Sequence, residues 1–239
     1  MISQSKKTNP IQTQFKPNQS QFPSRNAKKA NGVLTKFETM PHIGYAAGEA
    51  QNCYGKPVTR YVRHIVLVRP WLVLVVDDLE ASEPVQVGWL MHAKERFDLN
   101  EEEQTFVSHR NDAFMKVHLL TPGGFDFRQD DAWPVDPKQG YPMVTTEPPP
   151  KVWHFNAQRR QRSQKIRIAA IMAIGNGSDQ LECKVRRTMN GTAEIIATFA
   201  GIGQAKTTVD LSADRAPAQP IIEIHYELQG GQTEYLSIP

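Results

Sequence analysis

Residues Arg63–Leu79 constrain the fold of this chain more than any other segment. They form two short apolar runs that are separated by Pro70 and followed by the acidic pair Asp77 and Asp78. Both runs are rich in β-branched residues, so the segment predicts two strands folded on each other with Pro70 at the corner. The second run, Leu72–Val76, is apolar at every position, as expected for a strand that is covered on both faces.

Most of the chain after residue 31 alternates between apolar and polar residues. The clearest rows lie at residues 115–119, 165–172, 181–186 and 222–227. One apolar face and one polar face is the pattern of an antiparallel sheet, and no convincing long helix interrupts it. We therefore predict an all-β chain, folded as a large two-sheet antiparallel β-sandwich of roughly a dozen strands.

Four dipeptides indicate chain reversals. Asn176-Gly177 and Asn190-Gly191 are the sharpest hairpin signals, because glycine accepts a positive φ at little cost. Gly123-Gly124 and Gly230-Gly231 are weaker versions of the same signal.

Two segments fall outside the alternating pattern. Residues 1–30 contain six Lys or Arg and no Asp or Glu, and their polar composition predicts a disordered, solvated arm. Binding of a polyanion is the alternative, but spaced charges without an aromatic platform argue against nucleic acid. Residues 121–151 are rich in proline, so we expect a long irregular excursion within one sandwich domain that spans residues 31–239.

Several classes of protein are disfavoured by what the sequence contains. No run of about 18 apolar residues is present, so no membrane span is expected, and the N-terminal segment lacks a signal-peptide core. No two of the seven histidines stand at metal-binding spacing, and phosphate loops and dinucleotide fingerprints are absent. We expect no metal and no cofactor. Cys53 and Cys183 could pair or remain thiols.

The acidic pairs Asp77-Asp78 and Asp130-Asp131 raise the question of glycosidase carboxylates. Adjacent residues of a strand point to opposite faces, so neither pair forms an acid and base by itself. We expect both pairs to serve turns or strand ends.

Tryptophan and arginine side chains are candidates for sugar binding. Trp153 could stack on a pyranose ring, and Arg159, with its neighbours Arg160 and Arg162, could bind carboxylates or sulfates in a bidentate manner. The alternative is that the tryptophans pack in the core and that the arginines lie in a solvated loop or strand edge.

Trp89 is in phase with Val85, Val87 and Met91, so this row should face inward. His92 belongs to the opposite row, which should face outward or toward another domain.

Tyr54, the double strand Arg63–Leu79 and the strand Trp89–His92 occur in this order along the chain. This order resembles the C-terminal β-sandwich of the heparinase II/III-like polysaccharide lyases, most clearly over residues 31–92. The resemblance implies a sandwich that belongs with an enzyme of β-elimination on uronic-acid polysaccharides. In that family the main catalytic Tyr, His and Asn lie on an N-terminal helical toroid. A histidine-rich motif before the matched region adds a further His and a metal site, and it is not found here.

The resemblance therefore implies an accessory sandwich without catalytic residues of its own, inactive alone. The predicted substrate-binding residues are Arg63 and His92, which lie in the resembling segments, and Trp153 and Arg159, which are selected for their side-chain chemistry. The expected partners are an acidic polysaccharide and either a separate helical toroid domain or a second copy of the chain.

Two other readings remain open: a stand-alone carbohydrate-binding or structural sandwich, and a self-sufficient enzyme whose site is built by the proline-rich excursion. Family resemblance also suggests a periplasmic or extracellular location. A sandwich without its neighbour should expose an apolar patch.

Overall fold

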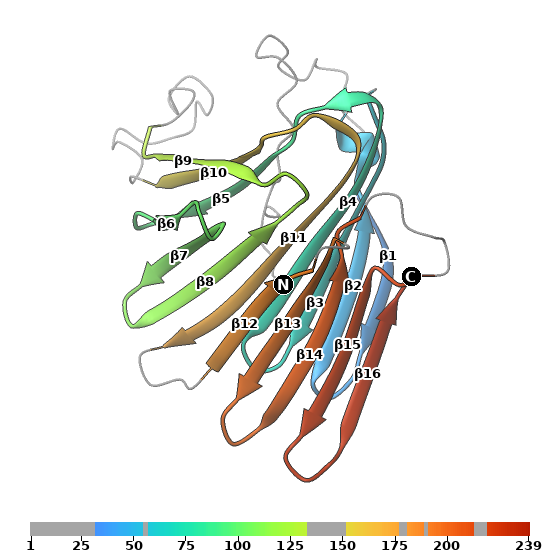
Figure 1. The fold of residues 1–239 in the computed structure, drawn as a ribbon, viewed down its shortest axis with the longest axis vertical. Coiled ribbons are helices and arrows are strands. Elements are labelled where there is room, and N and C mark those ends of the chain that lie inside the picture. Colours follow the sequence, from blue (N-terminus) through green and yellow to red (C-terminus); the bar gives the residue numbers. More distant parts are fainter. Residues whose placement is uncertain (1–31, 55–56, 133–151, 177–180, 189–190, 213–218) are drawn as a thin grey trace, which may run out of the picture.

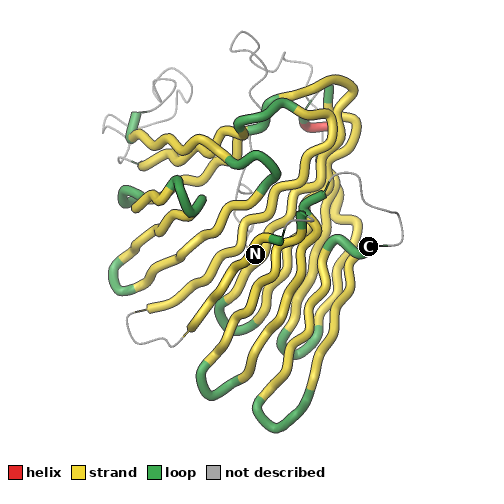
Figure 2. The backbone as a smooth tube through the Cα atoms, in the orientation of Figure 1, coloured by secondary structure: helices red, strands yellow, loops and turns green. Residues whose placement is uncertain are grey.

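The computed structural model describes residues 32–54, 57–132, 152–176, 181–188, 191–212 and 219–239 (Figure 1). The arm expected at residues 1–30 lies outside this range, as do residues 133–151 of the proline-rich excursion. Within the described part, the regular structure is antiparallel strand apart from one 3-10 turn, η1 (Gln51–Cys53) (Figure 2). The predicted all-β antiparallel class is confirmed.

The described strands form three sheets. An eight-stranded central sheet contains, in spatial order, β1 (Val33–Thr39), β2 (Ile43–Glu49), β3 (Val58–Val68), β4 (Leu72–Val85), β11 (Ser163–Asn176), β8 (Ala113–Leu120), β7 (Thr105–Arg110) and β6 (Asp98–Asn100). A three-stranded sheet contains β5 (Gly88–Ala93), β10 (Trp153–Arg159) and β9 (Phe125–Asp130). A five-stranded sheet contains β12 (Leu181–Arg187), β13 (Thr192–Phe199), β14 (Gly203–Asp210), β15 (Ile222–Leu228) and β16 (Thr233–Ile238).

The central sheet is covered on both faces at β4 and β11, so the chain has three layers there where the sequence predicted two. Along β4, Leu72, Leu74 and Val76 pack into the core shared with the five-stranded sheet. The intervening Val73 and Val75 pack against the core shared with the three-stranded sheet. Successive side chains of a strand point to opposite faces, so both faces of β4 pack against a core, although Val73 and Val75 are only partly buried. This explains the uninterrupted apolar run, and the corner at Pro70 joins β3 to β4 as predicted.

Strand β11 is also buried on both faces. Ile168 and Ala170 face the three-stranded sheet, whereas Ala169 and Ile171 face the five-stranded sheet. Arg167 is only 3 % exposed, so the polar face predicted for this strand is wrong at Arg167. Alternation of polar and apolar residues could not show this, because the arginine is buried as part of an ion pair.

The core beneath the three-stranded sheet is aromatic. Trp89 is 2 % exposed in it, which confirms the inward row predicted from its phase. The rings of Phe106 and Phe155 lie 4.3 Å apart between centroids, and Phe97 meets Phe106 edge-on at 5.6 Å. Such close ring pairs add to the stabilisation that their burial provides.

Two of the four turn dipeptides lie between paired strands. Gly191, with φ of 83°, lies between β12 and β13, and its partner Asn190 is outside the described residues. Gly230-Gly231 joins β15 to β16. The strands before and after Gly123-Gly124 belong to different sheets, and so do those before and after Asn176-Gly177, so the hairpin predicted at Asn176-Gly177 is wrong.

Strand β9 lies within residues 121–151, which were predicted to be irregular throughout, and that expectation is wrong at 125–130. Phe125 and Phe127 alternate with exposed residues there and face the aromatic core. Proline is therefore a poor guide to the first part of this segment.

Candidate functional site

Asp77 is a buried carboxylate that binds Arg63, the first of the predicted substrate-binding residues. Arg63 donates from Nε to Oδ1 of Asp77 at 2.6 Å and from Nη2 to Oδ2 at 2.8 Å, and the hydroxyl of Tyr61 donates to Oδ1 at 3.0 Å. Burial alone would lower the pKa of Arg63, but the Asp77 carboxylate more than offsets this and the pKa is raised. The guanidinium of Arg63 is therefore engaged in a structural pair.

Asp78 forms a second ion-pair cluster on the opposite face of β4. It accepts a hydrogen bond from Nη1 of Arg60 at 2.6 Å and from Nη2 of Arg167 at 3.2 Å. Burial alone would raise the pKa of Asp78, but these two arginines hold it below its ordinary value. Arg167 also donates to the carbonyl oxygens of Asp210 and Ser212, so this cluster ties the central sheet to the five-stranded sheet.

The Asp77-Asp78 pair was predicted to lie at a turn or strand end, and this prediction is wrong, because β4 continues to Val85. The expectation that adjacent acids face opposite ways is confirmed by their different partners.

His92 and Trp153 lie close together on the paired strands β5 and β10, but their side chains are on opposite faces of the three-stranded sheet. His92 pairs with His154, and their rings meet edge-on at 4.6 Å on the outward face. Burial and the neighbouring His154 lower the pKa of His92. Trp153 packs at the margin of the aromatic core, with the guanidinium of Arg96 5.5 Å from its ring centroid. His92 faces outward as predicted.

Arg159, the fourth predicted residue, is 3 % exposed at the end of β10. Its Nη2 donates to the carbonyl oxygen of Pro122 at 3.2 Å, while its Nε and Nη1 have no hydrogen-bond partner among the described residues. Burial lowers its pKa. The four predicted residues therefore do not form a single site. The next residue, Arg160, reaches the surface.

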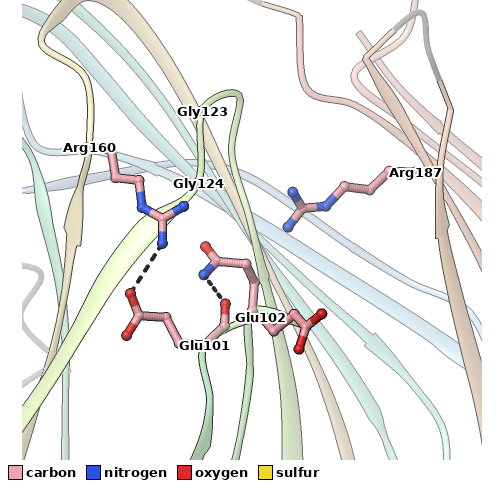
Figure 3. A pocket seen from close by; sticks show the side chains of 7 residues that line it. Glu101, Glu102, Gly123, Gly124, Arg160 and Arg187 are labelled. Atoms are coloured by element: carbon pink, nitrogen blue, oxygen red, sulfur yellow. Dashed lines mark hydrogen bonds and ion pairs between the residues drawn. The ribbon is translucent and has the colours of Figure 1, made fainter.

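A polar cleft of about 580 Å³ opens where the three sheets approach one another (Figure 3). It lies between the β6–β7 turn, the β8–β9 turn and the end of β12. Its lining residues are Glu101, Glu102, Gln104, Gly123, Gly124, Arg160 and Arg187. A neighbouring hollow of about 480 Å³ shares Glu102, Gln104 and Arg187 and is further lined by Glu103, His118, Leu120 and Val185.

Gln104 holds two walls of this cleft together. Its Nε2 donates to the carbonyl oxygens of Glu101 at 2.6 Å and Phe125 at 3.1 Å, and its Oε1 accepts the Phe125 N–H at 2.6 Å. Gly124 lies directly against it with φ of 74°, and a Cβ at this position would stand 3.1 Å from Oε1 of Gln104. The Gly123-Gly124 signal predicted a turn here, but no sequence pattern indicated the contact with Gln104.

Arg160 and Arg187 face the cleft from opposite sides (Figure 3). Arg160 donates to Glu101 Oε1 at 3.1 Å and to Asp126 Oδ1 at 2.8 Å, so its charge is balanced. Arg187 has a long contact of 3.4 Å to the carbonyl oxygen of Leu119 and no carboxylate partner among the described residues. Burial lowers its pKa. Arg187 is thus a cation next to open space, which is the arrangement that binds a carboxylate or sulfate.

His118 lies in the hollow beside Arg187. Burial, then the charges of Lys116 and Arg187, lower its pKa to about 4. Its Nε2 is buried without a hydrogen-bond partner in the part of the chain that the structure describes. The imidazole is therefore neutral at neutral pH.

The described residues contain no metal-binding cluster and no disulfide. No group of three or more His, Cys, Asp or Glu side chains there could hold a metal ion, and no helix there is long and apolar enough to cross a membrane. Cys53 in η1 and Cys183 in β12 are thiols and do not form a disulfide. Burial raises the pKa of Cys183 to about 11.

Comparison with known proteins gives matches among solved structures alone. No protein-family profile and no curated protein matches the sequence. The heparan sulfate lyase HepC from Pedobacter heparinus is similar over 77 % of this chain, at 12 % identity and a TM-score of 0.52. A heparinase III gene product is similar over 88 % of this chain, at 14 % identity and a TM-score of 0.51. The chain spans 29 % and 28 % of the lengths of these two proteins. It is therefore a β-sandwich domain whose fold is similar to part of the heparan sulfate lyases.

Proposed function

We propose that this chain is an accessory β-sandwich domain of a heparinase II/III-like lyase, which binds an acidic polysaccharide in the cleft between Arg160 and Arg187. The elimination chemistry would be carried by a separate helical toroid domain. One observation carries the proposal: Arg187 faces a polar cleft of about 580 Å³ without a carboxylate partner among the described residues. The fold that presents it is similar to part of known heparan sulfate lyases.

The chemistry of the cleft suits a sugar acid. A guanidinium offers two parallel N–H donors to a carboxylate or sulfate. The carboxylates of Glu101 and Glu102 lie in the same cleft and can accept hydrogen bonds from sugar hydroxyls. A lining that contains both cations and carboxylates favours a polar sugar unit, whose acidic group binds one guanidinium, over an apolar ligand.

The described polar groups support binding more than catalysis. Arg63 and Asp77 bind each other, so neither is available to neutralise a substrate carboxylate. His118 lies next to Arg187, but a base with a pKa of about 4 is weak at neutral pH. We therefore expect the purified chain to bind without cleaving.

A turnover assay tests this proposal. The chain is incubated with heparan sulfate, alginate and related uronans, and the ultraviolet absorbance of the unsaturated product is followed, with a heparan sulfate lyase as positive control. We expect no product from this chain, together with binding that weakens as salt is added. Steady product formation by the purified chain would contradict the accessory role.

A further inference from the structure

Strand β1 is an edge of the central sheet and carries exposed apolar side chains. Leu34 is 68 % exposed and Phe37 is 67 % exposed. The register places Phe37, Ala46 and Ile65 in one cross-strand row, and Ile65 is 43 % exposed. In the described residues no strand pairs with the outer side of β1. An unpaired edge with apolar side chains is a ready template for another strand.

The charges of β1 are arranged to complement a second copy of the same strand. Lys36 and Glu38 flank Phe37 and are 44 % and 41 % exposed, with Nζ of Lys36 2.9 Å from Oε1 of Glu38. When two such strands pair antiparallel about a two-fold axis at Phe37, Lys36 of each copy lies opposite Glu38 of the other. The two Phe37 rings then meet on the other face, since opposite residues share a face in an antiparallel pair.

We propose that β1 pairs with β1 of a second copy in this register, which joins the two central sheets into one continuous sheet across a two-fold axis. A two-fold interface uses the same patch on both subunits, so self-complementarity is its requirement. Main-chain hydrogen bonds along the edge supply affinity, and the flanking side chains select the register.

Neighbouring registers are disfavoured by the same residues. A two-fold axis at Lys36 or at Glu38 brings two like charges directly opposite each other, which is destabilising. A two-fold axis midway between Phe37 and a neighbouring residue would place Phe37 of one copy opposite Lys36 or Glu38 of the other. These side chains belong to opposite faces of the strand, so this register is also disfavoured. The register irregularity between Leu34 and Lys36 confines regular pairing to the part of β1 after it. The contact is therefore small, and we expect a dimer that dissociates on dilution.

Exchange of the charges tests the pairing on the full chain by sedimentation velocity over a range of concentrations. Lys36→Glu and Glu38→Lys should each weaken the dimer by about tenfold or more, because each places like charges opposite each other. An equimolar mixture of the two variants should restore the dimer, because the two acidic side chains of one variant then face the two lysines of the other. The mixture cannot restore the Lys36–Glu38 pair within one chain, so rescue reports the contact between copies.

Three outcomes would overturn the proposal: a wild-type chain that stays monomeric, single variants that dimerise as the wild type does, or a mixture that does not recover. Ile65→Glu is the matched variant for packing through the sheet face; if it alone abolishes the dimer, the face and not the edge is the interface. Circular dichroism shows whether each variant is folded. The proposal does not rest on polysaccharide binding, so either can fail without the other.

Discussion

Asp77 and Asp78 are consecutive residues of β4 whose carboxylates are buried on opposite faces of the central sheet, Asp77 against Arg63 and Asp78 against Arg60 and Arg167. Because both faces of this sheet are covered at β4, Asp77 is only 1 % exposed and Asp78 only 6 % exposed. Each is balanced by hydrogen-bonded cations, which is the condition under which buried charges persist. The acidic pair thus marks the interior of a three-layer fold.

Removal of Arg63 should be costly, because it leaves the Asp77 carboxylate buried without a countercharge. We expect Arg63→Met to lower the free energy of unfolding by about 3–5 kcal/mol, measured by urea unfolding with tryptophan fluorescence. Lys184→Met is the control, since Lys184 pairs with Glu182 on the surface with side chains 70 % and 63 % exposed. It should cost less than about 1 kcal/mol. Equal effects of the two substitutions would rule out a structural role for the Arg63–Asp77 pair.

Burial of both faces of β11 can be tested at two consecutive residues. Ala169 faces the five-stranded sheet and Ala170 faces the three-stranded sheet, and each is 1 % exposed. Ala169→Asp and Ala170→Asp should each destabilise the fold by more than about 3 kcal/mol, since each buries an unpaired carboxylate. Thermal unfolding measures both. In a two-layer sandwich one of the two positions would face solvent and tolerate the change.

One buried and one half-buried histidine, His64 and His118, should make the fold sensitive to acid. Burial lowers the pKa of His64 to about 4, and burial with neighbouring cations lowers that of His118 to about 4. The unfolded chain takes up these protons near pH 6.5. Stability should therefore fall as the pH drops from about 6.5 to about 4, by up to about 1.4 kcal/mol per pH unit for each histidine. The midpoint of urea unfolding should change less steeply with pH in His118→Gln than in the wild type. An unchanged dependence on pH would contradict the lowered pKa of His118.

Gln104 should matter to the cleft out of proportion to its size. Gln104→Ala removes two hydrogen bonds to Phe125 at the start of β9 and one to Glu101 within the β6–β7 turn. We expect a loss of about 1–3 kcal/mol in stability and weaker binding of acidic oligosaccharides. Gln204→Ala, which removes a single side-chain bond to Thr198 on the five-stranded sheet, is the control. Calorimetric binding that is unchanged in Gln104→Ala would show that this residue does not shape the site.

The fold class was predictable because strand alternation and the double strand at Pro70 are local signals. The third layer was not, although the apolar run Leu72–Val76 already indicated a strand covered on both faces. Arg167 hid the second buried face of β11, because a buried ion pair and a solvated charge look alike in a sequence. Turn chemistry marked the end of β11 at Asn176, but not that the next strand joins another sheet.

The candidate site was less predictable than the fold. Arg63 was predicted from the family resemblance and Arg159 from its chemistry, yet Arg63 forms an ion pair with Asp77 and Arg159 is buried. The sequence carries no signal for either outcome. The cleft is assembled from the β6–β7 turn, the β8–β9 turn and β12, which are far apart in the chain. Arg160 belongs to the arginine cluster that was named from the sequence as a candidate sugar-binding group. Arg187 was not predicted, because no local sequence pattern marks it.

Binding of a defined heparan sulfate oligosaccharide to Arg187→Gln and Arg186→Gln tests the central claim most directly. The two arginines are adjacent on β12, but Arg186 is 76 % exposed and pairs with Glu194, while Arg187 lines the cleft. We expect titration calorimetry to show about tenfold or greater loss of affinity for Arg187→Gln and near wild-type affinity for Arg186→Gln. Equal affinities of both variants and the wild type, or no binding by the wild type, would contradict the account.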